Sequence, residues 1–327
     1  MSLTLAIFYF CSKICCSEHQ PCHPERSEGS RQYTKTDPSS EKRSQDDKPC
    51  CSSSKMAKVE MRRVVYFFLF YILSLIFPIN VFADDVDTQL AKEAQNPVAD
   101  LITLPFQENM NYGYGPFNKM QNVLNIEPVI PIHLNAEWNL ISRTILPVES
   151  QPNFFRPEGR TNGIGDLNPT LFLSPANPSK IIWGLGPTFV FPTASHRVLG
   201  SGKWSIGPAA VILAMPRSWV LGVLAYNVWS FTGQSNRPNV NELTVQYFIS
   251  YNFPKGWYLT SSPINTADWM VSSRNRWTIP LGGGAGRTFH IGKQAINLSL
   301  QAFYNVKKPV IGPDWSTRLT FALLFPE

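Results

Sequence analysis

Three stretches in the C-terminal part of the chain alternate apolar and polar side chains with a period of two. Residues 243–253, 295–305 and 315–325 each place Leu, Ile, Val or aromatic residues on one face and mostly Thr, Gln, Asn, Ser or Arg on the other. Successive side chains of a β-strand point to opposite faces of the sheet, so this period predicts strands with one apolar face.

Further segments with weaker alternation complete a series of about twelve predicted strands. They span residues 104–114, 123–132, 135–146, 166–173, 181–191, 204–213, 219–231, 257–262 and 277–289. The segment 219–231 fits the period least well, because apolar residues occupy both of its faces. The glycines at 282–286 weaken the last segment and indicate a bulge or a close approach of another part of the chain.

The connections between these predicted strands alternate in length. Short turns follow His133 and cover residues 175–179, 215–217, 254–256 and 292–294. Longer polar loops at residues 149–162, 194–202, 233–239, 265–275 and 307–314 fall between them. Short turns on one rim and long loops on the other are typical of outer-membrane barrels. We therefore predict an all-β fold, an antiparallel transmembrane β-barrel of about twelve strands over residues 101–327, with both chain ends on the periplasmic side.

Tryptophans near the ends of the predicted strands support a membrane environment. Interfacial girdles of membrane barrels fall at these positions. The tryptophans concerned are Trp138, Trp183, Trp204, Trp219, Trp257, Trp277 and Trp315. The alternative is a secreted β-sandwich or a lipocalin-like barrel, which would turn its apolar faces inward and bury its tryptophans. The large aromatic faces favour the membrane barrel.

An apolar segment precedes the predicted barrel. It begins with Arg62 and Arg63, continues as an almost unbroken apolar run to Ile79, and turns acidic after Ala83. A basic start, an apolar centre and small residues at the exit are the three regions of a secretory signal peptide. We predict a signal peptide over residues 56–83 that is cleaved after Ala83. An uncleaved anchor is the alternative, but the run is shorter than the roughly 20 residues that a bilayer core requires.

The segments on either side of the signal peptide differ in composition. All six cysteines precede it, and residues 17–54 are too polar to fold. Adjacent pairs such as Cys15-Cys16 lack the spacers of a zinc site, so we expect neither a metal nor another cofactor. We predict that residues 1–55 are disordered and not part of the working protein. Residues 84–100 form a predicted periplasmic lead-in, with helical character up to Asn96-Pro97 and room to tuck into the lumen.

The net charge of the exported portion excludes one class of partner. From Asp84 onward the chain has 18 Lys plus Arg against 15 Asp plus Glu, a net charge of +3. This charge is too mild to indicate nucleic-acid binding. The expected partners are outer-membrane lipids, a small-molecule solute and the barrel assembly machinery.

Several motifs of the chain resemble a bacterial family. They are NPVADLITLPF at residues 96–106, GIGDLNP at 163–169, WGLGP at 183–187, LGSGKWSIGP at 199–208 and PLGGGAG at 280–286. Together they resemble a family of outer-membrane transporter-like barrels, loosely labelled "neuromedin U" and similar to barrels linked to the meta-pathway of phenol degradation. The resemblance covers nearly the whole chain after residue 96. It implies an outer-membrane channel or transporter without a defined substrate. Outer-membrane barrels usually end on an aromatic residue that the assembly machinery reads, and here Phe325 would have to serve from the third-last position.

The parity of the predicted strands points six charged residues into the lumen. They are Glu137, Arg143, Asp166, Glu242, Arg276 and Arg318. Rings of charge set the electric field in a pore and select solutes by sign and size. The alternative role, compatible with the first, is that these residues pair with one another in a narrow lumen. The resemblance implies small solutes, apolar or aromatic in character, and no covalent chemistry.

Two other functions remain open, a lipid-modifying enzyme and a surface adhesive or structural barrel. For an adhesive role, the loop 149–162 is the expected partner site. For an enzyme, the candidates would be His133, His196 and His290, which are predicted in turns and a loop rather than in mid-strand beside an outward-facing Ser. The chain also lacks a Gly-x-Ser-x-Gly motif, so its pattern does not favour lipid hydrolysis.

Overall fold

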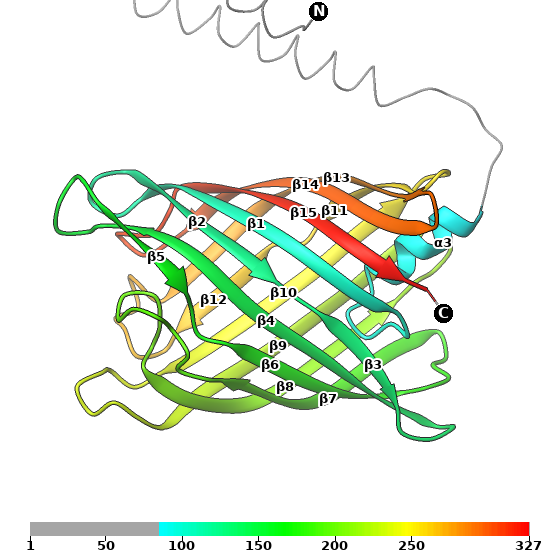
Figure 1. Cartoon of the computed structure of the whole chain (residues 1–327), viewed down its shortest axis with the longest axis horizontal. Coiled ribbons are helices and arrows are strands. Elements are labelled where there is room, and N and C mark those ends of the chain that lie inside the picture. The colour runs from blue at the N-terminus through cyan, green and yellow to red at the C-terminus, as the bar shows by residue number, and fades with distance from the viewer. Residues whose placement is uncertain (1–84, 327) are drawn as a thin grey trace, which may run out of the picture. The chain divides into compact units, whose positions relative to one another are not determined.

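The computed structural model describes residues 85–326 (Figure 1). The predicted signal peptide, its cleavage position and all cysteines lie outside these residues. The first described element is the helix α3, Asp85–Ala94, which ends before Asn96-Pro97 as the sequence predicts. Within residues 85–326, no helix has both the length and the apolar character needed to cross a membrane.

Antiparallel strands of a single sheet make up the rest of residues 85–326. In chain order they are β1 (Ile102–Tyr114), β2 (Lys119–Ile126), β3 (Val129–His133), β4 (Trp138–Pro152), β5 (Arg160–Ile164), β6 (Asn168–Pro175), β7 (Ile181–Val190), β8 (Lys203–Ala214), β9 (Trp219–Gly233), β10 (Asn241–Asn252), β11 (Trp257–Ser261), β12 (Ile264–Asp268), β13 (Trp277–Ile291), β14 (Gln294–Lys307) and β15 (Trp315–Phe325).

The sheet closes on itself to form a barrel. Strand β1 pairs with β15 from Ile102 opposite Phe325 to Tyr112 opposite Trp315. The ring is completed where β9 pairs with β10. Three crossings of the wall use two strands each, β2 with β3, β5 with β6, and β11 with β12. Counted by crossings, the structure is a closed antiparallel barrel of 12 strands, which confirms the predicted fold.

The interrupted crossings have local causes in the sequence. Pro128 separates β2 from β3, and Pro263 separates β11 from β12. Proline cannot donate a ladder hydrogen bond, so a strand stops or bends beside it. The predicted strand 123–132 therefore joins parts of two strands, β2 and β3. The predicted strand 257–262 covers only β11, the first half of its crossing. The predicted loop 149–162 is also too long, because β4 and β5 continue into it and leave only residues 153–159 as the connection.

Side chains along the wall alternate between the lumen and the outside. In β8 the odd-numbered residues from Lys203 to Leu213 are buried and the even-numbered residues are exposed. Strands β10, β14 and β15 turn the same faces inward that the sequence pattern predicts. Aromatic pairs lie near both ends of the barrel wall. Tyr112 stacks on Trp315 with ring centres 4.0 Å apart near the long loops, and Trp138 contacts Trp183 edge-on at 5.9 Å near the short turns.

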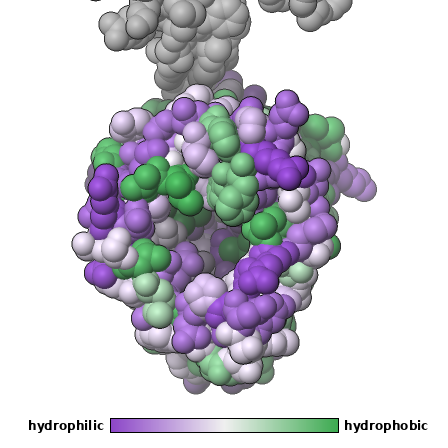
Figure 2. Space-filling view, turned by 90° about the vertical axis from the view of Figure 1, so that its left-hand side faces the viewer, coloured by the Kyte–Doolittle hydropathy of each residue, from purple (hydrophilic) through white to green (hydrophobic). Residues whose placement is uncertain are grey.

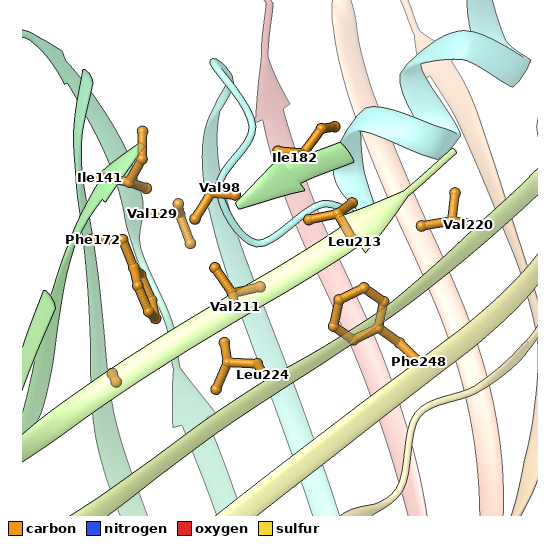
Figure 3. Close-up of a cluster of buried hydrophobic side chains, with 11 residues drawn as sticks. Val98, Val129, Ile141, Phe172, Ile182, Val211, Leu213, Val220, Leu224 and Phe248 are labelled. Carbon is orange, nitrogen blue, oxygen red and sulfur yellow. The ribbon is translucent and has the colours of Figure 1, made fainter. Parts of the chain in front are cut away.

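The main buried apolar cluster lies inside the barrel (Figure 3). We call its barrel residues the apolar wall, on the inward faces of β3, β4 and β6–β10: Val129, Ile141, Phe172, Ile182, Ala209, Val211, Leu213, Val220, Leu224 and Phe248. This wall explains the poor alternation of residues 219–231. Val220 and Leu224 of β9 face an apolar lumen, while Trp219 and Leu221 are exposed on the outside.

The N-terminal segment, residues 85–101, closes the short-turn end of the lumen, where α3 lies beside the C-terminal end of β15 (Figure 1). Leu90 of α3 is buried with Leu324. Val98, which follows the helix, packs against the apolar wall. Gln95 Nε2 donates a hydrogen bond of 2.9 Å to Asn252 Oδ1. The segment predicted as a periplasmic lead-in therefore sits inside the end of the barrel.

Candidate functional site

The lumen has a second, polar wall across from the apolar one. We call it the polar wall, and its residues come from the inward faces of β1, β11, β14 and β15 and from the break after β11: Gln107, Asn109, Tyr258, Ser262, Asn297, Ser299, Gln301, Arg318 and Thr320. Most of these side chains are neutral, and they hydrogen-bond to one another. Tyr258 Oη donates to Asn297 Oδ1 at 2.9 Å, and Ser262 Oγ donates to Gln301 Oε1 at 3.0 Å.

One of the glycines of the 282–286 run makes room for this wall. A Cβ at residue 286 would collide with the ring of Tyr258, which lies directly over the backbone of Gly286. The predicted close approach at these glycines is therefore real at this position. The absence of a side chain at Gly286 lets the Tyr258 ring pass close to β13, so that its hydroxyl reaches Asn297.

Both walls contribute to an inner cavity of about 190 Å³. The apolar wall supplies Leu224 and Phe248, and the polar wall supplies Gln301 and Thr320. The N-terminal segment lines the cavity with residues 94–97. A solute in this cavity would therefore meet hydrocarbon on one side and amide or hydroxyl groups on the other.

An ion pair also borders the inner cavity. Arg143 Nη2 lies 2.9 Å from Glu127 Oε2, and the two side chains are only 14% and 10% exposed. Gln107 Nε2 donates a longer hydrogen bond of 3.4 Å to the other Glu127 oxygen. The sequence predicted Arg143 in the lumen, and the structure places it there. Glu127 was missed, although its odd number places it on the same face of its predicted strand as Asn125.

Arg318 lies deep inside the lumen and is only 7% exposed. Its Nε donates to Asn109 Oδ1 at 3.1 Å, and its Nη1 donates to the Ser262 carbonyl at 2.8 Å. Its guanidinium carbon lies 5.0 Å from the ring centre of Phe303. Among residues 85–326, Arg318 makes no ion pair with a carboxylate.

The strand register locates Arg318 along the barrel. Gln107 stands opposite Thr320, and both line the inner cavity. Two residues further toward the long loops, Asn109 stands opposite Arg318. Two residues further again, Asn111 lines a second cavity. Arg318 and Asn109 therefore form the level that separates the two cavities.

The second cavity, which we call the vestibule, lies at the long-loop end and measures about 660 Å³. Figure 2 looks onto this end, where the surface is hollowed between polar and apolar residues. Glu242 faces Asp268 across the β10–β12 pairing, and Arg276 lies near them in the same cavity. The Arg276 guanidinium carbon is 5.3 Å from the Trp269 ring centre, and its buried Nε has no hydrogen-bond partner among residues 85–326. Residues 309–313 give the vestibule an aliphatic rim.

Two predicted lumen residues lie elsewhere. Glu137 is exposed in the turn between β3 and β4, because β4 begins only at Trp138 and strand parity does not extend into a turn. Asp166 lies in the break between β5 and β6, where it accepts hydrogen bonds from the backbone N–H and hydroxyl of Ser201 at 2.6 and 2.8 Å. It lines neither cavity and instead fixes the loop between β7 and β8.

The histidines lie near the barrel ends and in a loop. His290 Nδ1 is 2.8 Å from Asp87 of α3, and His133 Nε2 is 3.5 Å from Asp100. Both contacts hold the N-terminal segment at the short-turn end. His196 lies in the loop after β7, where its Nδ1 is 3.1 Å from the hydroxyl of the adjacent Ser195.

The closed twelve-stranded wall defines an antiparallel β-barrel with a fold like that of outer-membrane proteins. No protein-family model matches the chain, and no curated protein matches it. Among solved structures, the fold is similar to the COG4313 outer membrane channel from Pseudomonas putida F1, with a TM-score of 0.53 and 18% identity over 69% of this chain and 94% of that one. The outer membrane phospholipase OMPLA from Salmonella typhi matches with a TM-score of 0.40 and 12% identity, over 75% of this chain and 99% of that one. The Pseudomonas putida toluene transporter TodX matches with a TM-score of 0.33 and 9% identity, over 68% of this chain and 87% of that one. This likeness is one of fold, and a shared fold does not by itself define a function.

Proposed function

We propose that this protein is a channel of the bacterial outer membrane that passes small solutes with an apolar or aromatic part. The observation that supports the proposal is a lumen with two cavities, one on each side of the Arg318 level, in which an apolar wall faces a polar wall. The structure from Pseudomonas putida F1 with a similar fold is described as a channel. The proposal includes no covalent chemistry.

The volume of the inner cavity sets the size of the solute. An apolar cavity of about 150 Å³ is enough to hold benzene, and the inner cavity measures about 190 Å³. It therefore has room for one aromatic ring. The ring would contact Leu224 and Phe248, while substituents would hydrogen-bond with Gln301 or the Thr320 hydroxyl. Movement of the Arg318 side chain and of residues 94–97 would open the two ends of this cavity.

Single-channel recording tests the proposal with protein purified from the outer membrane. We expect discrete conductance steps in planar bilayers, and swelling of protein-containing liposomes in small aromatic solutes. An Asn109→Trp substitution should reduce both signals, because it places an indole at the level of Arg318. The matched control is Met110→Trp on the outward face of the same strand, which should leave both signals unchanged. The absence of conductance and of swelling in the wild-type protein would overturn the proposal.

A further inference from the structure

The guanidinium group of Arg318 has unused hydrogen-bonding capacity. Arginine carries five N–H donors in a planar fork. The structure accounts for two bonds, to Asn109 Oδ1 and to the Ser262 carbonyl. Both acceptors are neutral, and no carboxylate among residues 85–326 pairs with this arginine. Arg143, which lines the inner cavity, is neutralised by Glu127 at 2.9 Å.

Burial makes the unpaired charge unfavourable in the empty lumen. An arginine that is only 7% exposed has lost most of its water shell, and neutral acceptors replace that shell incompletely. An anion that binds the guanidinium restores the missing interaction. A carboxylate fits best, because its two oxygens match the planar fork of the guanidinium.

The surroundings of Arg318 fit an anion that also has an apolar body. One face of the guanidinium is covered by the Phe303 ring at 5.0 Å. Gln107 and Thr320, next to Arg318 toward the short turns, line the inner cavity. That cavity continues to Leu224 and Phe248 on the apolar wall. A carboxylate held by Arg318 could therefore direct an attached ring into the cavity of about 190 Å³.

We propose that Arg318 is the recognition site for the carboxylate of a small aromatic or aliphatic carboxylic acid, whose apolar body occupies the inner cavity. This inference rests on the proposed channel function and names the class of solute. The vestibule does not select for the carboxylate, because its lining has two acidic residues, Glu242 and Asp268, against one cation, Arg276. Selection for the anion belongs to the level of Arg318, after the solute has passed the acidic pair.

Block of the chloride current by benzoate tests the site, with benzyl alcohol as the neutral probe of similar shape. A hydrogen bond to a charged group contributes about 1.5 kcal/mol or more, so benzoate should halve the wild-type current at a concentration about tenfold lower than benzyl alcohol. In Arg318→Gln the two probes should become equivalent. Arg318→Lys keeps the positive charge but loses the planar fork of donors, so its preference for benzoate should be intermediate between those of the wild type and Arg318→Gln. Lys180→Gln removes the same charge from an exposed turn and should behave as wild type.

The outcomes separate this inference from the proposed function. If the wild-type channel conducts but benzoate and benzyl alcohol block it equally, the carboxylate site is wrong and the channel stands. The same conclusion follows if Arg318→Gln, shown to be folded by circular dichroism, retains the preference for benzoate. If the wild-type protein does not conduct, the channel proposal fails. Calorimetric titration of the purified wild-type protein with benzoate and benzyl alcohol then decides the site alone, and an equal or absent binding signal overturns it.

Discussion

The two walls of the lumen satisfy their inward side chains in different ways. The apolar wall packs against itself and against Val98 of the N-terminal segment. The polar wall is held by hydrogen bonds between neutral side chains, such as Ser262 with Gln301, and contains one unpaired cation, Arg318. Packing that excludes solvent stabilises a barrel, whereas directional groups beside a cavity can recognise a solute. If the protein is the proposed channel, the apolar wall mainly stabilises the barrel and the polar wall mainly selects the solute.

The walls also differ in their place along the chain. The apolar wall comes mostly from consecutive strands, β6 to β10, whereas the polar wall joins β11, β14 and β15 to β1 across the closure of the barrel. A solute between the walls would be oriented by this asymmetry, with its apolar body toward β9 and its polar group toward β15. A lumen lined by one kind of side chain could not impose such an orientation.

The largest expected effect is on the apolar wall, at Phe172. This side chain is fully buried at 0% exposure. Replacement by alanine should lower the free energy of unfolding by about 4 kcal/mol, because it removes the buried ring and leaves a cavity. Urea titration of the refolded barrel in detergent micelles, followed by tryptophan fluorescence, measures the change.

A matched control exists in the loop between β4 and β5. Phe155 is 93% exposed, so Phe155→Ala should change the free energy of unfolding by less than about 0.5 kcal/mol. Equal effects of the two substitutions would show that the apolar wall does not stabilise the barrel more than a surface loop does. The contrast between the walls would then lose its basis.

A smaller loss of unfolding free energy is expected when the ion pair between Glu127 and Arg143 is broken by Glu127→Gln. The substitution leaves Arg143 buried without its carboxylate, which should cost about 2 kcal/mol of unfolding free energy, since the pair is charge-assisted but borders a cavity. Adding Arg143→Met should recover part of that loss. A double-mutant cycle measures the coupling, and a coupling near zero would indicate that water in the lumen already screens the pair.

Alternation along the chain predicted the barrel fold, its roughly twelve crossings and the inward faces of β10, β14 and β15. It did not predict the breaks that divide three of the crossings. It could also have revealed Glu127, whose parity is inward. It could not place Glu137 or Asp166, because parity holds only within a strand and both residues lie in turns or breaks. Each hydrogen bond to Asp166 comes from a loop about thirty residues away, which no local pattern encodes.

The two-walled lumen could not be predicted from any single strand. Residues 219–231 looked like the poorest strand because both faces are apolar. The structure shows that one face of this segment is exposed on the outside of the barrel and the other belongs to the apolar wall. Which strands share a wall depends on the closure between β9 and β10 and between β1 and β15, and therefore on contacts distant in sequence.

The outward faces of the strands behind the two walls also differ in polarity. Behind the apolar wall, β8 exposes Ile206 and Ile212 on the outside of the barrel. Behind the polar wall, β1 presents Glu108, whose neighbours across the pairing are Leu124 and Leu319. The buried Oε1 of Glu108 has no hydrogen-bond partner among residues 85–326. Polarity in β1 thus reaches the outward face, where a carboxyl group would be unfavourable in contact with lipid.

Replacement of Glu108 by leucine should therefore raise the free energy of unfolding by about 1 kcal/mol, the smallest of these effects, since acidic groups cost less than basic ones on the lipid face of a barrel. The same urea titration measures it, with the protein refolded in lipid vesicles instead of micelles. Glu108→Gln removes the charge but keeps a polar group, so its gain should be smaller than that of leucine. A loss of stability in Glu108→Leu would mean that the carboxyl group makes a stabilising hydrogen bond within the membrane. Polar side chains of β1 would then be held by hydrogen bonds on the outward face as they are on the lumen face.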